Sequence, residues 1–461
     1  MVEPRIIPRE EHTVSRRDID PDALKVLYRL RQGDHVAYLV GGSVRDLLLG
    51  RRPKDFDIGT SAHPYQVKKL FRNCWIIGRR FRLAHVRFGN KVIEVATFRR
   101  QVQPGEEIVE DGVPAAPIAD TDGVVVTPEE SAAPARSDAA LLHRDNTFGT
   151  PEEDAFRRDF TINALFYDIS NFSIIDYVHG LEDLRAGIVR SIGDPNERFR
   201  EDPVRMQRAV ALAARLGFTV DPPILAAIRK LRGEIAASSP ARLIEEYYKI
   251  LRGGSAEKTF RALVDAGLVE PISKELHRGA GAELWQSLAN LDAYRSQFAS
   301  TPETFTNPVL LGSLLVPLGL VPQPGRHSSR HEDVSEAADG PAEENADQKR
   351  PSVPAFRLGT LPLARRDVER LRQLLGLQRR LMDVGAGPRA KRALTHRSTF
   401  REALTWLEIH GRSPDVVEHW ISVLAERGAD EPVQPVEEGG APGGVRRRRR
   451  RRGRGRPATE R

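Results

Sequence analysis

The chain has 461 residues, of which 40% are hydrophobic and 29% charged, and it contains a single cysteine, Cys74. This length suits two to four domains, because one hydrophobic core rarely grows beyond about 300 residues. A lone cysteine excludes an intramolecular disulfide and a zinc site built on cysteines, and it fits a reducing cytoplasm. No apolar run approaches the roughly 18 residues of a membrane span, and Met1–Glu10 has no apolar stretch typical of a secretory signal. We therefore expect a cytoplasmic protein with no membrane partner.

The net charge of +7 is unevenly distributed along the chain. The segment Arg446–Arg461 holds ten arginines and one glutamate, which places +9 in this tail and −2 in the rest. Attraction to a polyanion such as RNA is therefore expected to be strongest in the tail, with Arg446, Arg447 and Arg448 among the RNA-binding residues.

Composition also divides the chain into segments. The pattern predicts a flexible N-terminal arm at residues 1–20 and an α+β domain at 21–185. A helical segment at 186–255, a longer helical region at 256–430 and a disordered tail at 431–461 are expected to follow. Two stretches rich in Pro, Gly, Ala and acidic residues predict disordered inserts at about 101–140 and 322–354.

The first domain shows mixed strand and helix patterning. Helices are predicted where apolar residues repeat every three to four positions, and strands where they alternate or form short runs. In chain order, the expected elements are helix 22–30, strand 36–40, helix 44–49, strand 55–58, helix 64–71, strand 76–77 and a hairpin of strands 84–88 and 92–98. This mixture predicts a small α+β domain.

A pair of carboxylates stands out in the strand predicted at 55–58. Asp55 and Asp57 alternate with Phe56 and Ile58, so both carboxylates are expected on one face of the strand. Converging carboxylates can bind Mg²⁺, which prefers oxygen ligands, and two such ions suit in-line displacement at phosphorus. Most D-x-D pairs are ordinary surface charges, so this pair needs further support.

That support comes from the preceding turn. The apolar strand at 36–40 enters Gly41, Gly42 and Ser43, after which a helix begins. Glycines allow a phosphate to approach the backbone, and a helix N-terminus offers unpaired N–H donors. A plain strand-to-helix turn would use the same residues. Followed by Asp55 and Asp57, however, the pattern resembles the polymerase-β-like nucleotidyltransferases and predicts a phosphate site beside a metal site.

The third carboxylate of such a site has two candidates. Glu94 is the only acid in the apolar strand at 92–98, where it is either a metal ligand or an exposed edge charge. Asp159 competes for this catalytic role, or it binds the ribose while Arg157 and Arg158 contact phosphates. Arginine pairs this close are also common on plain helical surfaces.

The segment Glu201–Arg205 is predicted to open a helix, with Asp202 as the N-cap and Pro203 at the first helical position. The buried stripe of this helix is expected to end at Gly217. Asp202 and Arg205 are then either part of a capped helix with a solvated basic face, or contacts to the base of an incoming nucleotide.

Four motifs together resemble the class II nucleotidyltransferases, which comprise bacterial poly(A) polymerases and CCA-adding enzymes. They are Leu39–Asp46, Asp55–Asp57, Arg157–Leu165 and Glu201–Arg205. The resemblance implies a nucleotidyltransferase head with a five-stranded sheet, followed by all-α neck, body and tail domains. It implies ATP as substrate, two Mg²⁺ ions on Asp55, Asp57 and Glu94, and a nucleotide site that includes Arg45.

Other segments resemble the bacterial poly(A) polymerase I branch of this family. They are Ile76–Val86, Leu142–Gly149, Asp168–Gly180 and the C-terminal stretch Arg365–Gly411. The basic residues Arg79, Arg80 and Arg82 are expected to contact primer RNA, although a basic surface hairpin would look the same. The expected partners are RNA 3′ ends in mRNA, small RNAs and decay intermediates, together with RNA-degradation machinery.

The favoured hypothesis is template-independent polyadenylation, in which AMP passes from ATP to an RNA 3′-hydroxyl and diphosphate leaves. The first alternative is a CCA-adding tRNA nucleotidyltransferase, which performs the same chemistry on a tRNA end. The second is an RNA-binding protein that has lost catalysis, which the intact set of Asp55, Asp57 and Glu94 argues against.

Overall fold

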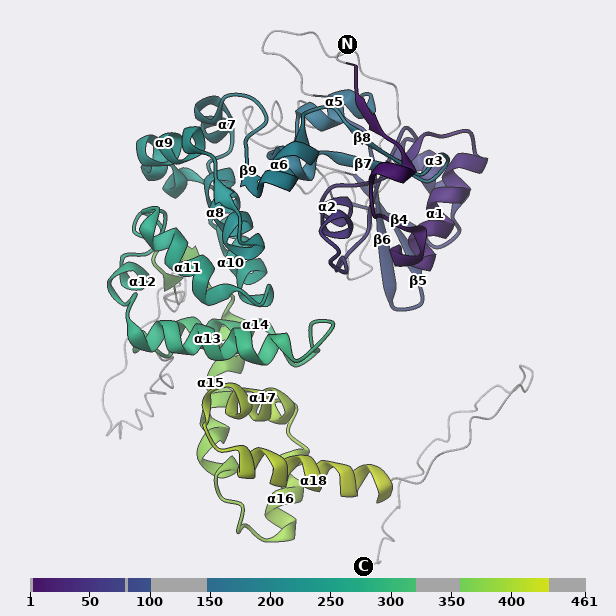
Figure 1. Cartoon of the computed structure of the whole chain (residues 1–461). Helices are drawn as coiled ribbons and strands as arrows, with labels where there is room; N and C mark the ends of the chain where they lie inside the picture. The colour runs from purple at the N-terminus through teal and green to yellow at the C-terminus, as the bar shows by residue number, and fades with distance from the viewer. Residues whose placement is uncertain (1–2, 79–81, 101–146, 321–356, 431–461) are drawn as a thin grey trace, which may run out of the picture.

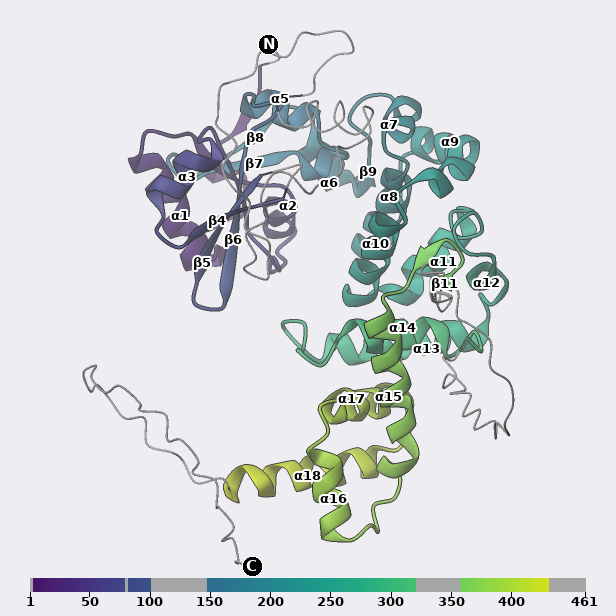
Figure 2. The same ribbon diagram turned by 180° about the vertical axis from the view of Figure 1, so that it is seen from behind.

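The computed structural model describes residues 3–78, 82–100, 147–320 and 357–430 (Figure 1). The two predicted inserts and the predicted tail lie almost entirely outside these ranges, as do Arg79, Arg80 and Arg446–Arg448. Within the described ranges the chain is an α+β protein whose sheet lies at one end and whose helices continue from it in an arc (Figures 1 and 2). The predicted fold class is therefore confirmed.

The sheet in the described residues has eight strands, so the expected number of five is wrong. Its order is β1-β8-β7-β2-β3-β6-β5-β4, and every neighbouring pair is antiparallel except β3 and β6. The strands are β1 (Arg5–Ile7), β2 (Ala37–Val40), β3 (Asp57–Thr60), β4 (Cys74–Ile77), β5 (Leu83–Phe88), β6 (Lys91–Thr97), β7 (Leu165–Asp168) and β8 (Ser173–Asp176). The five predicted strands correspond to β2–β6.

The three additional strands gave weak sequence signals. All four residues of β7 and all four of β8 are buried, so neither strand shows an alternation of buried and exposed positions. β1 has only three residues, and it pairs with β8 at the edge of the sheet. Ile7, Val14 and Ile19 are buried in the core, so residues 3–20 are packed against the domain and do not form the flexible arm predicted for 1–20.

Helices cover both sides of the sheet. α1 (Pro21–Gln32) is capped by Asp20, whose side chain accepts hydrogen bonds from the backbone N–H groups of Asp22 and Ala23. α1 and α3 (Pro64–Leu70) pack against β3–β6 and bury one face of these strands. The remaining helices of this part are η1 (Arg9–Glu11), η2 (Arg16–Asp18), α2 (Gly42–Leu48), α5 (Pro151–Phe156), η3 (Thr161–Asn163) and α6 (Gly180–Ala186).

The rest of the described chain is almost entirely helical. The helices are α7 (Pro195–Glu201), α8 (Val204–Leu216), α9 (Pro222–Leu231), α10 (Pro240–Arg252), α11 (Ala256–Asp265), α12 (Lys274–Arg278), α13 (Ala282–Ser296), α14 (Asn307–Leu315), α15 (Arg365–Leu381), α16 (Pro388–Thr395), α17 (Phe400–His410) and α18 (Pro414–Asp430). Two short two-stranded sheets join β9 (Ile188–Val189) to β10 (Thr219–Val220) and β11 (Arg357–Leu358) to β12 (Leu361–Pro362). No helix in the described ranges is both long and apolar enough to cross a membrane.

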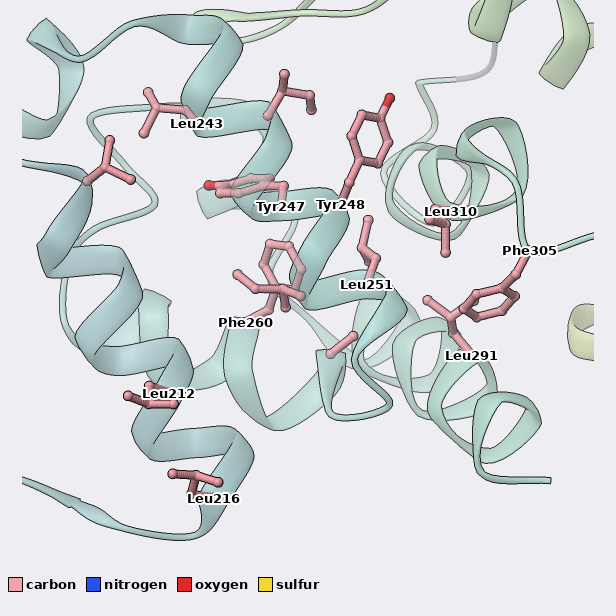
Figure 3. Close-up of a cluster of buried hydrophobic side chains, with 14 of the residues drawn as sticks. Leu212, Leu216, Leu243, Tyr247, Tyr248, Leu251, Phe260, Leu291, Phe305 and Leu310 are labelled. Atoms are coloured by element: carbon pink, nitrogen blue, oxygen red, sulfur yellow. The ribbon is translucent and has the colours of Figure 1, made fainter. Parts of the chain in front are cut away.

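A continuous core links successive helices of the arc. Figure 3 shows Leu212 and Leu216 of α8 near a cluster that includes Tyr247 of α10 and Phe260 of α11. The rings of Tyr247 and Phe260 meet edge to face with centroids 5.1 Å apart, a favourable aromatic geometry. Because these residues come from α8, α10 and α11, burial of each of these helices depends on the presence of the others.

α14 lies at the centre of the C-terminal half. Every one of its residues from Pro308 to Leu315 is buried, as expected for a helix that is apolar all round. A Cβ added at Gly312 would lie 2.4 Å from the indole of Trp406 on α17, so only glycine allows the two helices to pack this closely. The side chain of Ser313 donates or accepts a hydrogen bond with His410 at 3.0 Å.

We expect His410 to make stability depend on pH. Burial lowers the pKa of His410 to about 4 from its ordinary 6.5. The unfolded chain therefore binds more protons between these values, and the stability contribution is complete above pH 6.5 and lost as pH falls towards 4. The residue is only partly buried, so we expect about 2 kcal/mol, less than the full pKa difference would give. Between pH 7 and pH 4.5, the free energy of unfolding measured with denaturant should fall more for the wild type than for His410→Gln. Equal decreases for the two proteins would contradict the lowered pKa of His410.

Candidate active site

The turn after β2 places glycine where no other residue fits well. Gly41 has φ 74°, a left-handed conformation that residues with a Cβ rarely adopt. A Cβ there would also lie 3.0 Å from Nη1 of Arg158. α2 begins at the next residue, and the buried Ser43 hydroxyl donates to the carbonyl oxygen of Val40. Gly41 therefore lets the Arg158 guanidinium lie directly against the backbone.

Gly41→Ala should be more harmful than Gly50→Ala. Both glycines have positive φ, 74° at Gly41 and 64° at Gly50, but Gly41 combines it with ψ −134°, a conformation that only glycine adopts readily. A Cβ at Gly41 would also lie 3.0 Å from Nη1 of Arg158, whereas nothing lies within 4 Å of a Cβ at Gly50. We expect Gly41→Ala to lower the free energy of unfolding by about 2 kcal/mol more than Gly50→Ala, because backbone strain and the Arg158 contact add together. Equal losses in denaturant unfolding would contradict a special structural role of Gly41.

Asp57 and Glu94 lie side by side on neighbouring strands. β3 and β6 run parallel with Ile58 opposite Val95, and both of these residues are buried. Side chains alternate along a strand, so Asp57 and Glu94, one residue earlier on each strand, lie together on the opposite, exposed face. The predicted proximity of these two carboxylates is thus present in the structure.

Asp55 differs from its predicted position. β3 begins at Asp57, because β2 has turned away at Gly41 and its last partner in the ladder is Val40 opposite Asp57. Asp55 therefore precedes the strand, and its side chain is 74% exposed with the Lys54 ammonium 3.8 Å from Oδ2. The two aspartates do not share a strand face as expected.

The three carboxylates nevertheless influence one another. The pKa of Asp57 is raised to about 6, first by desolvation among surrounding protein atoms and then by the charges of Glu94 and Asp55, while Arg158 opposes the shift. Asp57 still has an exposed surface, so the repulsion between carboxylates is the cause that a bound cation would relieve. Within the described ranges no three His, Cys, Asp or Glu side chains already converge as ligands. The donor set suits a hard cation, but Asp55 must reorient to complete it.

A buried acid that the sequence did not indicate holds both arginines of the predicted pair. Asp154 on α5 accepts from Nε of Arg157 at 2.8 Å and from Nη2 of Arg158 at 2.9 Å. Although burial opposes it, the two guanidinium groups hold the pKa of Asp154 below its ordinary value. Arg158 also donates from Nη1 to the carbonyl oxygen of Asn163 at 3.0 Å. Asp154 therefore fixes Arg158 between the turn at Gly41 and the carboxylate of Asp57.

Asp159 faces the helical region. Its Oδ2 lies 2.8 Å from Nη2 of Arg208 on α8, and its Oδ1 accepts the backbone N–H of Phe160. Arg198 of α7 donates from Nη2 to the carbonyl oxygens of Arg157 and Arg158, at 2.7 and 2.8 Å. These contacts join the sheet end of the molecule to α7 and α8.

Arg45 is buried and fully engaged in the structure. It contacts its neighbour Asp46 through Nε and Nη2, at 2.8 and 2.7 Å, and donates from Nη1 to Oδ1 of Asn163. A Cβ added at Gly42 would lie 3.3 Å from the same guanidinium. Arg45 thus braces the first turn of α2.

Asp202 and Arg205 lie at the junction between α7 and α8. Asp202 ends α7, and α8 begins at Val204 after Pro203, which already has helical dihedral angles. The Asp202 side chain accepts the backbone N–H of Val204 at 3.3 Å, so it caps the start of α8 as predicted. The Asp202 carboxylate pairs with both terminal nitrogens of Arg242, at 3.1 and 2.7 Å. Arg205 donates to Oε2 of Glu201 at 2.9 Å. The predicted end of α8 at Gly217 is confirmed.

The predicted residues have four partners that motif patterns did not indicate: Asp154, Arg198, Arg208 and Arg242. Arg198, Arg208 and Arg242 come from other elements, so spacing within a motif could not reveal them. Asp154 lies three and four residues before Arg157 and Arg158, and this helical spacing was the signal that could have identified it. Of the basic residues predicted near the primer, the structure describes Arg82, which precedes β5 and has φ 37°.

Three family profiles match the chain. One described as "Poly A polymerase head domain" matches residues 37–190, and one described as "Probable RNA and SrmB- binding site of polymerase A" matches 217–279. The third, "Polymerase A arginine-rich C-terminus", matches 346–455.

The chain is also similar to curated proteins and to solved structures. Poly(A) polymerase I of Salmonella typhi is 47% identical over 273 residues, 59% of this chain and 54% of that protein. A CCA-adding enzyme of Lactobacillus helveticus is 34% identical over 256 residues, 55% of this chain and 56% of that protein. The chain thus spans about half the length of these relatives. The crystal structure of the Bacillus stearothermophilus CCA-adding enzyme in complex with CTP has a TM-score of 0.48 and 24% identity, covering 89% of this chain and 83% of that one.

Proposed function

We propose that this chain is a class II nucleotidyltransferase, of the superfamily of bacterial poly(A) polymerases and CCA-adding enzymes, and that it polyadenylates RNA. The reaction transfers AMP from ATP to an RNA 3′-hydroxyl, forms one phosphodiester bond and releases diphosphate. The observation that carries this proposal is the placement of Asp57 beside Glu94 on one exposed sheet face, next to Gly41 and Arg158.

Asp55, Asp57 and Glu94 are the residues we propose to hold two Mg²⁺ ions. The raised pKa of Asp57 supports this, because carboxylates that repel one another gain most from a shared cation. Mg²⁺ bound there would lower the pKa of the attacking hydroxyl and neutralise the leaving diphosphate. Glu94 is favoured over Asp159 as the third carboxylate, since Asp159 is committed to Arg208.

The chain's own side chains then bind and orient the nucleotide. Gly41, Gly42 and Ser43 allow phosphates to approach the backbone, and Arg158 supplies a positive charge already held in place by Asp154. Arg157 completes this group, and the buried Arg45 is proposed to support the nucleotide site by holding the first turn of α2. Asp202, oriented by Arg242, and Arg205, oriented by Glu201, are proposed to contact the base edge. The Asp159–Arg208 pair is proposed to position α8 relative to the carboxylates.

RNA is the proposed partner, and the helical region is its proposed binding surface. α15 and α16 expose several arginines, among them Arg379, Arg380 and Arg392, and the predicted RNA-binding tail follows them. Together with the polymerase A descriptions of all three profiles, this supports residues 21–185 as the catalytic head, 186–255 as a neck for nucleotide and RNA, and 256–430 as an RNA-binding region. RNA-degradation machinery is a further proposed partner.

CCA addition is the second candidate, because CCA-adding enzymes are relatives of this chain. The greater identity to poly(A) polymerase I, 47% against 34%, favours polyadenylation. A primer-extension assay with Mg²⁺ separates the two. Long products from an unstructured RNA primer with ATP alone support polyadenylation. A fixed addition of CTP- and ATP-derived residues to a tRNA lacking its terminal CCA, with no long products from ATP alone, would overturn it.

A further inference from the structure

A straight row of side chains crosses the open face of the sheet. Trp75 of β4 is opposite His85 of β5, and His85 is opposite Glu94 of β6. Continuing the parallel register of β3 and β6 by one residue adds Asp57 to the row. Directly opposite residues share a sheet face, so an indole, an imidazole and two carboxylates form one line. The His85 Nε2 lies 3.6 Å from Oε1 of Glu94.

The Trp75 end of the row is apolar and uncovered in the described structure. Trp75 is 49% exposed and Ile77, the next residue on the same face of β4, is 44% exposed. Within the described ranges no aromatic ring or cation pairs with the indole, whereas Trp285 is covered by Arg261. α1 and α3, which pack on β4–β6, lie on the buried side of these strands. Among the described residues, the exposed indole therefore lies on the same face as the carboxylates, two strands from Glu94.

The two ends of the row face different parts of the molecule. The β2 side adjoins the helical region, since Arg51 donates to the carbonyl oxygen of Leu216 at the end of α8. Asp202 and Arg205, proposed to contact the base of ATP, belong to that same region. β4 is the strand at the far edge of the sheet, beyond β6 and β5 (Figure 1). With the incoming nucleotide on the α8 side of Asp57, the side towards Trp75 is the part of the exposed face that the described residues leave open to the primer.

We propose that Trp75 is a stacking platform for a base near the 3′ end of the RNA primer. This rests on the proposed function, which brings the primer 3′-hydroxyl to Asp57 and Glu94. Three inter-strand steps separate Trp75 from Asp57, about 14 Å, which is well within the length of single strand that such surfaces cover, about 4 nucleotides or more. A flat indole can stack on any base because every base has a π-face, so Trp75 would increase the affinity for primer RNA without sequence preference.

Steady-state kinetics on an oligo(A) primer test this role with Trp75→Ala and Trp75→Phe. We expect Trp75→Ala to raise the KM for primer about tenfold, with kcat and the KM for ATP unchanged within about twofold, because only one stacked base is lost. Trp75→Phe keeps an aromatic face and should remain within about threefold of the wild type. Ile6→Ala is the matched control, since it removes another exposed apolar side chain, 59% exposed on β1 at the opposite edge of the sheet, and should change neither KM.

A primer with one abasic position near its 3′ end provides an independent readout. If Trp75 stacks on the missing base, that primer should weaken the wild type about as much as Trp75→Ala does, and the two changes together should add little further loss. The proposal would be overturned if, for an abasic site at each of the last four primer positions, the increase in primer KM simply added to the increase caused by Trp75→Ala. It would also be overturned by an unchanged primer KM, or by a raised KM for ATP alone, which would place the nucleotide or a protein partner on this face.

Fluorescence separates failure of this proposal from failure of the proposed function. Trp75 is one of four tryptophans, and stacking should quench its emission when oligo(A) binds without ATP. Trp75→Phe should lose this quenching and still bind the primer. A wild type that is quenched but extends no primer retains the platform and refutes the function, whereas an active wild type without Trp75-dependent quenching refutes only the platform.

Discussion

Replacing Asp57 by asparagine is expected to lower the rate of AMP incorporation at least about a thousandfold. Asparagine keeps the size of the side chain but removes the charge that the proposed ions require, a loss of roughly 4 kcal/mol or more in transition-state stabilisation. Binding of primer RNA should stay within about twofold, because Asp57 contributes no positive charge to the RNA surface. Single-turnover extension of a labelled primer and a separate binding titration measure the two effects.

Three further variants show whether the loss of activity is specific to the proposed metal ligands. Asp265→Asn changes an exposed aspartate on α11, outside the site, and should leave extension unchanged. Glu94→Gln should be nearly as harmful as Asp57→Asn, whereas Asp159→Asn should lose less, because its partner Arg208 lies on α8. If Asp57→Asn retained activity within tenfold of the wild type, the assignment of Asp57 as a metal ligand would be wrong.

Replacing Asp154 by alanine is expected to give the largest loss of stability, about 3–5 kcal/mol. The carboxylate is buried, and its removal leaves the guanidinium groups of Arg157 and Arg158 without their acceptor. Loss of one partner of a buried ion pair is costly because an uncompensated charge remains. Urea unfolding at pH 7 measures the difference, with Asp265→Ala as the exposed control expected within about 0.5 kcal/mol of the wild type.

The same group should contribute to acid sensitivity. The folded-state pKa of Asp154 is depressed, so its stabilisation is present above the unfolded pKa near 3.9 and is lost as pH falls through the folded value. The wild type should therefore lose stability below about pH 4 more steeply than Asp154→Ala. Parallel losses for the two proteins would show that the Arg157 and Arg158 contacts do not stabilise the charged form.

The sequence indicated the parts of the fold whose signals are local. α1 has a capping aspartate and a buried stripe, and α8 has a stripe that ends at Gly217, so both helices were expected nearly as they are. β7 and β8 were missed because strands buried on both faces lack alternation, and β1 because three residues carry too little pattern. Such strands form because they pair with segments far away in the sequence, and the periodicity of apolar residues does not reveal that pairing.

The candidate site shows the same division between local and distant signals. Gly41 and the carboxylates Asp57 and Glu94 could be selected from short patterns, because a turn and two strands position them. The partner of Asp202 could not, since Arg242 reaches it only through the folded arrangement of α8 and α10. Asp154, four residues before Arg158, has a helical spacing that could have indicated their pairing. Asp55 was placed on the strand because the alternation suited it, yet the ladder ends at Asp57.

The most direct test of the central claim measures AMP incorporation and diphosphate release together, with and without Mg²⁺. The wild type should extend an RNA primer with ATP, release one diphosphate for each AMP added, and lose this activity when EDTA removes the metal. Asp57→Asn should show neither product in Mg²⁺. Extension that continues in EDTA, or incorporation without matching diphosphate, would contradict metal-dependent adenylyl transfer at Asp57 and Glu94.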